Sequence, residues 1–378
     1  DGDGTIIAGH GRVMAARKLG EKEVPCIELG HLTEAQKRAY VIADNQLALN
    51  AGWDAEMLKV EIAELVDADF DLGLLGFDDA MLAGLTGVET EGLTDPDDAP
   101  EPPAVPVTVL GDVWVLGNHR LMCGDSTSID NLDKLIDKQL VDLVVTDPPY
   151  GVSYADKNRS LNAIGRGNRI QTPIKNDHLK GNDLEDFFLG AFSAMFAAMK
   201  PGASFYVFAP QGGEQMMMMM MMQKAGLPVR HELIWIKNNH VLGRADYHYK
   251  HEPILYGWKE GAGHPWFGGR NKFSIWNIDK PTQSKLHPTM KPVELLEIPI
   301  NNSSKGSDIV LDLFGGSGST MMACEKAGRN CRMMELDEKY CDVIITRWQD
   351  FTGQQAILDG DGRTFDEIAG TRLQKAAE

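Results

Sequence analysis

The sequence lacks long apolar runs and is poor in cysteine. No stretch approaches the roughly 18 apolar residues that a membrane-spanning helix needs, and no basic, apolar leader opens the chain. Its 378 residues contain five cysteines without a C-x-x-C pair: Cys26, Cys123, Cys324, Cys331 and Cys341. Scattered cysteines argue against a disulfide framework and against a structural zinc site. We therefore expect a cytoplasmic protein of two or three domains, with no membrane association and no bound metal.

Several enzyme signatures are also missing. Without G-x-x-x-x-G-K-[ST], a P-loop NTPase is disfavoured, and without H-x-E and P-C-x-x-C, so is a zinc deaminase. Carbon-5 cytosine methylation needs a thiolate nucleophile after a proline, and the only such pair is Pro25-Cys26. That pair falls in residues 24–29, a predicted strand, where a buried and inert cysteine is expected.

Basic residues are scarce, because 37 Lys plus Arg face 55 Asp plus Glu, a formal charge of −18. Taken whole, this excess of acid disfavours nucleic-acid binding, since phosphate contacts need Lys and Arg. The acid is concentrated in residues 1–106, where 22 acidic residues face 7 basic ones, a net of −15. Residues 107–378 then hold 33 acids and 30 bases, a net of only −3. This larger part can carry a local basic face.

An acidic, proline-rich segment separates the two parts. Residues 89–106 carry six acids, no base and five prolines, which predicts a semi-extended linker without regular structure. In front of it, residues 5–8 and 24–29 are candidate strands. A helix is expected over residues 33–50, and Asp54 is a candidate N-cap for another.

Behind the segment, strand-like and helix-like stretches alternate, which is typical of an α/β protein. Strands are predicted at residues 141–147, 203–208, 231–237, 308–314 and 331–336. Seven consecutive methionines, residues 216–222, favour a helix packed on the sheet, because Met is a good helix former and an adaptable core residue. The tail after about Gly360 is polar and predicts no element.

A glycine-rich motif, DLFGGSGST at residues 312–320, follows an apolar strand and opens a predicted helix that ends near Gly328. Glycines there let the backbone approach a ligand, and the helix start presents unpaired N–H groups. Glu335 follows Gly315 by 20 residues, at the end of the next predicted strand. At that spacing in a nucleotide-binding βαβ unit, a carboxylate can accept both ribose hydroxyls.

A second motif, Asp147-Pro148-Pro149-Tyr150, stands where a predicted buried strand ends. Prolines fix the backbone and remove N–H donors, so nearby carbonyls are left as acceptors. Asp147 and the carbonyl of Pro148 can each accept one N–H from an exocyclic amine, and Tyr150 offers a face on which a base can stack. The motif favours binding of an amino-bearing planar base over an ordinary turn.

Together, these motifs resemble the DNA amino-methyltransferases that use S-adenosylmethionine, and their order resembles the β group of that family. The resemblance covers residues 107–355 and implies a Rossmann-like methyltransferase sheet. It implies that Asp125 contacts the cofactor adenine and that HPTMKPVELL, residues 287–296, closes over its methionine part. The cofactor-binding residues so implied are Asp125, Asp312, Phe314, Gly315, Gly316, Ser317, Gly318, Glu335 and Lys291. The implied catalytic residues are Asp147, Pro148, Pro149 and Tyr150.

The front part resembles the ParB-like nuclease superfamily through residues 6–20 and 43–54. That fold normally begins earlier, so an N-terminally incomplete α+β domain is expected. Gly9-His10-Gly11-Arg12 is a candidate phosphate site, or a turn in which His10 and Arg12 pair with nearby carboxylates. The expected domains are 1–88 (ParB-like), 89–106 (linker), 107–357 (methyltransferase) and 358–378 (polar tail). Such fusions are similar to phage, prophage and restriction–modification methylases.

The resemblance implies methyl transfer to the N6 of adenine in double-stranded DNA, since Asp is the usual first motif residue of adenine enzymes. N4-cytosine methylation by the same mechanism is the alternative, and the oligomeric state, a homodimer included, is left open. Phosphate contacts are expected from a basic loop, to which Lys175 also belongs, and from a second surface with aromatic side chains. The basic candidates are Lys157, Arg159, Arg166, Arg169, Arg244, Arg270 and Lys272.

Two readings from other classes compete. A NAD-dependent oxidoreductase would share the glycine-rich turn and Glu335, but it leaves the DPPY motif unexplained. A non-catalytic partition-type DNA adaptor could be built on the front part, but the net charge of −15 there disfavours direct DNA binding.

Overall fold

The computed structural model describes most of the chain behind the front part. The described residues are Ile6, 10–31, Thr33, Ile62, 92–151, 175–238, 246–279 and 290–377. The chain divides into two units, Asp1–Asp71 and Leu72–Glu378, and each is treated by itself. Among the described helices, none is both long and apolar enough to cross a bilayer.

In the first unit, the structure describes one helix, α1 (His10–Lys18), which the candidate phosphate residues His10 and Arg12 open. The predicted strand at residues 24–29 is wrong: the segment is irregular, and Ile27 is 88% exposed. Cys26 is exposed rather than buried, because no strand among the described front residues pairs with this segment. The expected strand at residues 5–8 and the expected helices lie outside the described residues, apart from the helical, buried Ile62.

The second unit is built on one mixed sheet of ten strands in the order β10-β1-β2-β9-β8-β3-β4-β6-β5-β7. The neighbours from β2 to β4 are parallel, while β6 is antiparallel to β4 and β5, and β1 to β2 and β10. The strands are β1 (Val113–Leu116), β2 (His119–Cys123), β3 (Val141–Thr146), β4 (Met199–Phe208), β5 (Val229–Ile236), β6 (His251–Trp258), β7 (Ile275–Asn277), β8 (Ile309–Asp312), β9 (Asn330–Glu335) and β10 (Ile357–Leu358).

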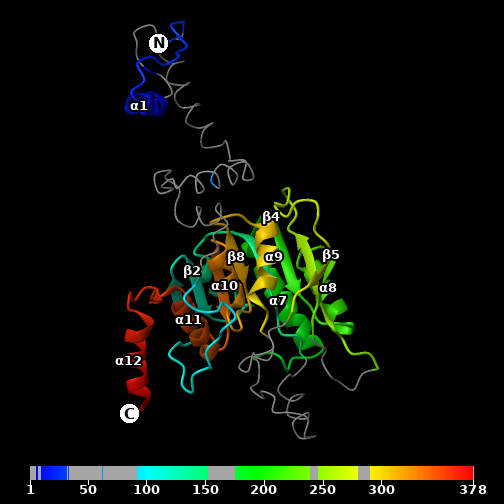
Figure 1. The fold of residues 1–378 in the computed structure, drawn as a ribbon. Helices are drawn as coiled ribbons and strands as arrows, with labels where there is room; N and C mark the ends of the chain where they lie inside the picture. Colours follow the sequence, from blue (N-terminus) through cyan, green and yellow to red (C-terminus); the bar gives the residue numbers. More distant parts are fainter. Residues whose placement is uncertain are drawn as a thin grey trace. The chain divides into compact units, whose positions relative to one another are not determined.

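Helices cover both faces of this sheet (Figure 1). The helices of this unit are α5 (Ile129–Ile136), α7 (Asn182–Ala198), α8 (Gly213–Lys224), α9 (Val293–Ser303), α10 (Ser319–Lys326), α11 (Glu338–Thr352) and α12 (Phe365–Ala377). Buried side chains of α5, α7 and α8 form one hydrophobic cluster with the sheet, and those of α9, α10, α11 and α12 form another. The arrangement is the three-layer architecture expected of a methyltransferase sheet.

The central strands are buried on both faces, which explains their apolar sequences. In β3, Leu143 and Val145 join the cluster of α9 to α12, while Val144 joins the cluster of α5 to α8. All five strands predicted behind the acidic segment are confirmed, as is the methionine helix. In α8, Met218 and Met222 are fully buried whereas Met216 is exposed, so only one face of the run packs on the sheet.

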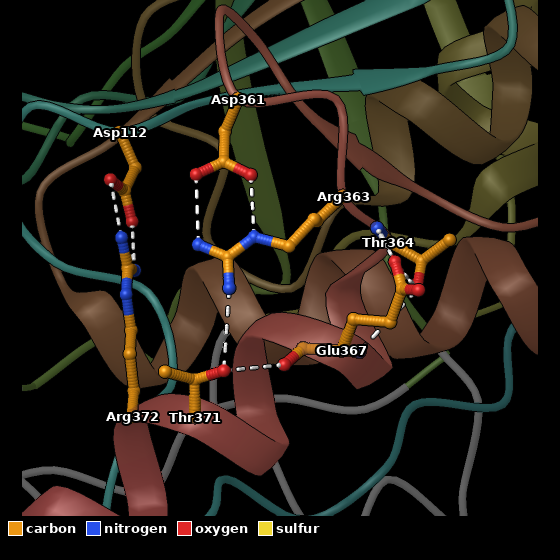
Figure 2. A network of polar contacts seen from close by, with 7 residues as sticks. All are labelled: Asp112, Asp361, Arg363, Thr364, Glu367, Thr371 and Arg372. Atoms are coloured by element: carbon orange, nitrogen blue, oxygen red, sulfur yellow. Dashed lines mark hydrogen bonds and ion pairs between the residues drawn. The ribbon is translucent and has the colours of Figure 1, made fainter.

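The C-terminal residues are part of this fold, so the expectation of an uninformative polar tail from residue 358 is wrong. Phe365 and Ile368 are buried, and the ring of Phe365 meets that of Trp114 edge-on with centroids 5.3 Å apart. Figure 2 shows the polar side, where Arg372 pairs with Asp112 through both carboxylate oxygens and Arg363 pairs with Asp361. Thr364 and Glu367 form a reciprocal N-terminal cap. The amphipathic pattern of α12 was not recognised in the sequence because many of its residues are polar.

The acidic segment contains no helix or strand over its described residues 92–106, as predicted, but it does not hang free. Leu93 N donates to Phe351 O at 2.8 Å, and Val107 N, just after the segment, donates to the buried Asp342. Asp97 Oδ1 accepts from Val293 N at 2.9 Å, at the start of α9. The semi-extended segment is therefore fastened to α9 and α11 by hydrogen bonds.

Candidate active site

Both sequence motifs lie at one place, the point where the strand order of the sheet reverses. β3 and β8 are adjacent and parallel, with Val144 opposite Leu311. From β3 the chain continues through α7 to β4 on one side, and from β8 it continues through α10 to β9 on the other. In open α/β sheets, ligands bind at the carboxyl ends of the strands at such a switch point.

The glycine-rich loop is tightly fixed where it leaves β8. Gly315 N donates to Met334 O at 2.8 Å, and a Cβ on Gly315 would lie 2.8 Å from the Met333 side chain. Gly318 has φ +87° and lies against Ile344, which a Cβ would approach to 3.0 Å. Close packing and a left-handed backbone explain why the loop needs glycine at these positions.

Asp312, the last residue of β8, anchors the start of this loop. Its Oδ1 accepts from Thr146 Oγ1 at 2.7 Å, and its Oδ2 accepts from Thr320 Oγ1 at 2.6 Å. The carboxyl is buried, and desolvation raises its pKa to about 6. Both oxygens accept hydrogen bonds inside the protein, so Asp312 ties the ends of β3, β8 and α10 together.

Glu335 ends β9 opposite Cys123, the last residue of the parallel strand β2, and Asp125 follows two residues later. Glu335 Oε2 accepts from Gly316 N at 2.7 Å, and its Oε1 accepts from Asp337 N at 2.8 Å. Burial raises the pKa of Glu335 to about 7. Asp125 is exposed and accepts from the backbone and hydroxyl of Thr127. Two carboxyls thus border the glycine-rich loop.

The DPPY motif follows β3 directly. Tyr150 Oη donates to Asp147 Oδ1, three residues away, and Pro148 is buried between them. Asp147 is half-buried. Phe314 of the neighbouring motif is also half-buried and packs against Phe187 with ring centroids 5.8 Å apart. Because β3 pairs with β8 and Thr146 bonds to Asp312, the DPPY motif and the glycine-rich motif are neighbours in space.

Lys291, expected to contact the cofactor, lies at the DPPY carboxylate. Its Nζ donates to Asp147 Oδ2 and lies 3.4 Å from Glu252 Oε2. Glu252 also pairs, through Oε1, with Lys237. Four alternating charges thus run from Asp147 to Lys237.

Of the predicted DNA contacts, Lys157, Arg159, Arg166, Arg169 and Arg244 lie outside the described residues. Arg270 and Lys272 are described and exposed. The same stretch of the chain, residues 246–279, also carries exposed aromatic side chains, namely Tyr247, Tyr249, Trp266, Phe267 and Phe273. Lys175, counted with the basic loop, pairs instead with Glu338 at 2.9 Å. The described part of this surface combines positive charge with rings.

Comparison with known proteins decides the family. A family model described as DNA methylase matches residues 141–346, more than half of the chain, and spans both motifs. The chain belongs to the N6/N4 DNA methylase family. A second model, the ParB-methyltransferase HTH domain, matches residues 56–110. The predicted family and the ParB-like front part are thereby confirmed, and the second match runs through the acidic segment.

Individual relatives of this DNA methylase are type II methyltransferases. M.HpaI of Haemophilus parainfluenzae is 24% identical over 282 residues, 68% of this chain and 83% of the relative. M.Cfr9I of Citrobacter freundii is 30% identical over 139 residues, 34% of this chain and 46% of the relative. Among solved structures, the PvuII DNA methyltransferase (cytosine-N4-specific) is 16% identical with TM-score 0.47, covering 72% of this chain and 94% of that chain.

The sequence missed several residues that shape the methylase site. Thr146 joins β3 to Asp312, and Arg347 donates to the Ser317 carbonyl in the glycine-rich loop. Glu252 and Lys237 extend the charge chain from Lys291. Their only sequence signal was an ionisable or hydroxyl residue at the end of an apolar run, which is common on any protein surface.

Proposed function

We propose that this DNA methyltransferase uses S-adenosylmethionine to methylate the exocyclic N6 of adenine in double-stranded DNA, in the cytoplasm. The observation that carries the proposal is the 2.7 Å hydrogen bond between Thr146 and Asp312. It joins the ends of the strands that carry the DPPY and glycine-rich motifs. An amine acceptor and a nucleotide-binding loop are therefore held next to each other at the switch point.

The residues around the loop fit the cofactor. A Cβ on Gly315 would clash with the buried Met333, which fixes the loop against β9, whereas a Cβ on Gly316 would meet no atom within 4 Å, so the backbone there is open to a ligand. Glu335 has acceptor oxygens suited to ribose hydroxyls, and Asp125, two residues after the end of the neighbouring strand β2, is exposed and offers an acceptor to an adenine amine. When bound, S-adenosylmethionine supplies an electrophilic methyl group. Both motifs of the family support this assignment.

The chain's own task is to prepare the target amine, whose lone pair is delocalised into the ring. Asp147 and the carbonyl of Pro148 each accept a hydrogen bond from one N–H group of the target amine, and together they favour a tetrahedral nitrogen. Asp147 then stabilises the cationic amine as it forms. Alignment of this kind supplies roughly 7–11 kcal/mol of a barrier.

A base paired in the duplex must leave the stack before its amine can reach Asp147. Tyr150 offers a ring on which the flipped base stacks, which offsets a few kcal/mol of unstacking. In the free protein, the Tyr150 hydroxyl occupies Asp147 Oδ1, so an incoming amine exchanges with it. Arg270, Lys272 and the exposed rings of the same stretch are our candidates for contact with the phosphates and the unstacked strand.

Adenine is proposed over cytosine because the motif begins with Asp. The same acceptors serve the N4 amine of cytosine, and the likeness to a cytosine-N4-specific enzyme keeps that alternative in view.

The test is nucleoside mass spectrometry of DNA from a methylase-deficient host that expresses this chain, beside its Asp147→Ala variant. N6-methyladenine that disappears in the variant is expected. N4-methylcytosine would keep the mechanism and reverse the base. If the protein is folded and binds S-adenosylmethionine but the DNA contains neither methylated nucleoside, the proposal is overturned.

A further inference from the structure

Glu252 stands between two lysines beside the catalytic motif. It is the second residue of β6, and its carboxylate pairs with Lys237 through Oε1 and lies 3.4 Å from Lys291 Nζ through Oε2. Lys291 in turn contacts Asp147 Oδ2. Glu252 therefore reaches Asp147 through a single intervening side chain.

The four side chains are largely withdrawn from solvent. Lys291 is 10% exposed, Lys237 is 11%, Glu252 is 18% and Asp147 is 26%. Charges in such surroundings are costly unless each one is paired. Two anions and two cations alternate along the chain, so each lysine has a carboxylate and Glu252 has a lysine on either side. The network is electrically balanced only while Glu252 is ionised.

Aromatic faces restrict both ammonium groups further. Lys291 Nζ lies 4.9 Å from the centroid of the Phe208 ring, and Lys237 Nζ lies 5.0 Å from that of Trp235. Cation–π contacts of this kind favour one position for each head group. With Phe208 on β4 and Glu252 on β6, Lys291 is held by two strands that pair with each other. The position of its Nζ is thus set by the sheet.

This placement affects the acceptor that the proposed reaction needs. Lys291 holds Oδ2 of Asp147, which fixes the rotation of the carboxylate and leaves Oδ1, now bonded to Tyr150, for exchange with the amine. If Asp147 were the only carboxylate beside Lys291, the ammonium would cancel much of the attraction of Asp147 for a cationic amine. Glu252 supplies a second anion that offsets the charge of Lys291, so the site of Asp147 stays negative for the amine that becomes cationic.

We propose that Glu252 is a positioning residue for methyl transfer: through Lys291, it fixes the Asp147 carboxylate, and it offsets the positive charge that Lys291 places beside it. The inference rests on the proposed function, because the role of Asp147 is defined there. It also assigns Lys291 to the catalytic carboxylate and not to cofactor affinity.

The experiment measures kcat, KM for DNA and the dissociation constant of S-adenosylmethionine for the full chain and its Glu252→Gln variant. We expect kcat to fall about 10- to 100-fold, as for a misplaced catalytic group, with both binding constants within about two-fold. Glu252→Asp keeps the charge and should recover part of kcat. The matched control is Glu232→Gln on β5, where the exposed carboxylate accepts from Gln215 Nε2 at 3.0 Å.

Lys291→Met, which keeps a long unbranched side chain, is the second variant. The proposal expects reduced kcat and unchanged cofactor affinity, and this outcome decides the matter if Glu252→Gln does not fold. Weakened cofactor binding with kcat preserved would overturn it, as would a folded Glu252→Gln enzyme with normal kcat. A wild-type chain that methylates no DNA would overturn the proposed function itself. Failure of the proposed function can thus be told apart from failure of the role proposed for Glu252.

Discussion

Arg347 on α11 donates from Nη1 to the carbonyl oxygen of Ser317 in the glycine-rich loop, at 2.7 Å. Its Nη2 donates to Pro96 O at 2.5 Å, in the acidic segment. The guanidinium is buried, and desolvation lowers its pKa to about 10, so it stays charged at neutral pH. One arginine therefore ties the loop proposed to hold the cofactor to a segment more than 200 residues away in sequence.

Arg347→Met should weaken both the fold and cofactor binding. Carbonyl groups of Ser317 and Pro96 lose a charged donor, and a hydrogen bond to a charged group contributes about 1.5–3 kcal/mol. Urea unfolding and calorimetric titration with S-adenosylmethionine measure the two effects. Arg230→Met, which removes an exposed pair with Glu260 and a cation–π contact with Trp258, is the control and should lower the free energy of unfolding by less than Arg347→Met does. Equal stability of the two variants would contradict the role of Arg347.

Asp97→Ala tests the docking of the acidic segment on α9. Asp97 accepts from the backbone N–H of Val293 in the first turn of that helix, as an N-cap side chain does. Loss of such a bond lowers the free energy of unfolding by about 1 kcal/mol. Glu101→Ala, at an exposed position of the same segment, should leave it unchanged. An undiminished midpoint for Asp97→Ala in urea would mean that this contact does not stabilise the protein.

Gly318→Ala should impair the glycine-rich loop. Its φ of +87° disfavours any side chain, and the new Cβ would lie 3.0 Å from Ile344. Strain of this kind costs about 1–3 kcal/mol, and we expect cofactor affinity to fall as the loop shifts. Gly213→Ala, in α8 where a Cβ has open space, should be neutral or stabilising by up to about 1 kcal/mol. Differential scanning calorimetry and cofactor titration compare the pair.

Cofactor affinity should depend on pH through Glu335. Its pKa is raised to about 7, so the carboxyl is mostly protonated at pH 6 and mostly ionised at pH 8. Ribose hydroxyls donate to the ionised form, so affinity should rise roughly ten-fold from pH 6 to pH 8. Titration calorimetry at both values measures this change, and Glu335→Gln should abolish it. A wild-type affinity that is flat over this range would exclude Glu335 as the ribose acceptor.

Folding stability should respond to Glu335 in the opposite sense. The unfolded carboxyl titrates near its ordinary value, so the raised pKa favours the folded state at low pH. This contribution is complete below about pH 4 and is lost as pH rises through about 7. Urea unfolding across this range should show that the free energy of unfolding falls more steeply with pH for the wild type than for Glu335→Gln. Identical pH profiles for the two proteins would contradict this prediction.

Phe365→Ala tests whether α12 belongs to the core. The buried ring meets Trp114 edge-on, and truncation of a buried phenylalanine costs about 3–5 kcal/mol. Leu373→Ala, on an exposed position of the same helix, should cost far less. Thermal unfolding measures both, and a Phe365 variant as stable as the Leu373 variant would show that the helix is dispensable.

The sequence predicted the parts of the fold whose signals are local. β3, β4 and β8 are apolar, β-branched runs buried on both faces, and the glycine-rich turn needs its residues for local backbone reasons. β6 escaped notice because Glu252, Pro253 and Gly257 interrupt its apolar pattern, although pairing with β4 and β5 fixes it as a strand. α12 and residues 92–106 were misjudged because their apolar contacts and buried hydrogen bonds involve partners distant in sequence.

The site was predicted as two motifs but not as an electrostatic unit. Asp147 and Glu335 stand in recognisable sequence contexts, whereas the pairing of Asp147 with Lys291 spans 144 positions. The contact depends on how the segment before α9 returns to β3, which no local pattern encodes. Lys291 was therefore assigned to the cofactor by resemblance alone, and its contact with Asp147 leads to a different prediction.

The two outer strands of the sheet are its shortest. β10 has two residues and β7 has three, and each pairs with a longer neighbour. A long bare edge invites backbone pairing with another molecule, and natural sheets avoid this by shortening or covering the edge. A ten-stranded sheet with such ends offers little template for strand addition. Strand addition through the backbones of β7 and β10 themselves is therefore disfavoured by the construction of the sheet.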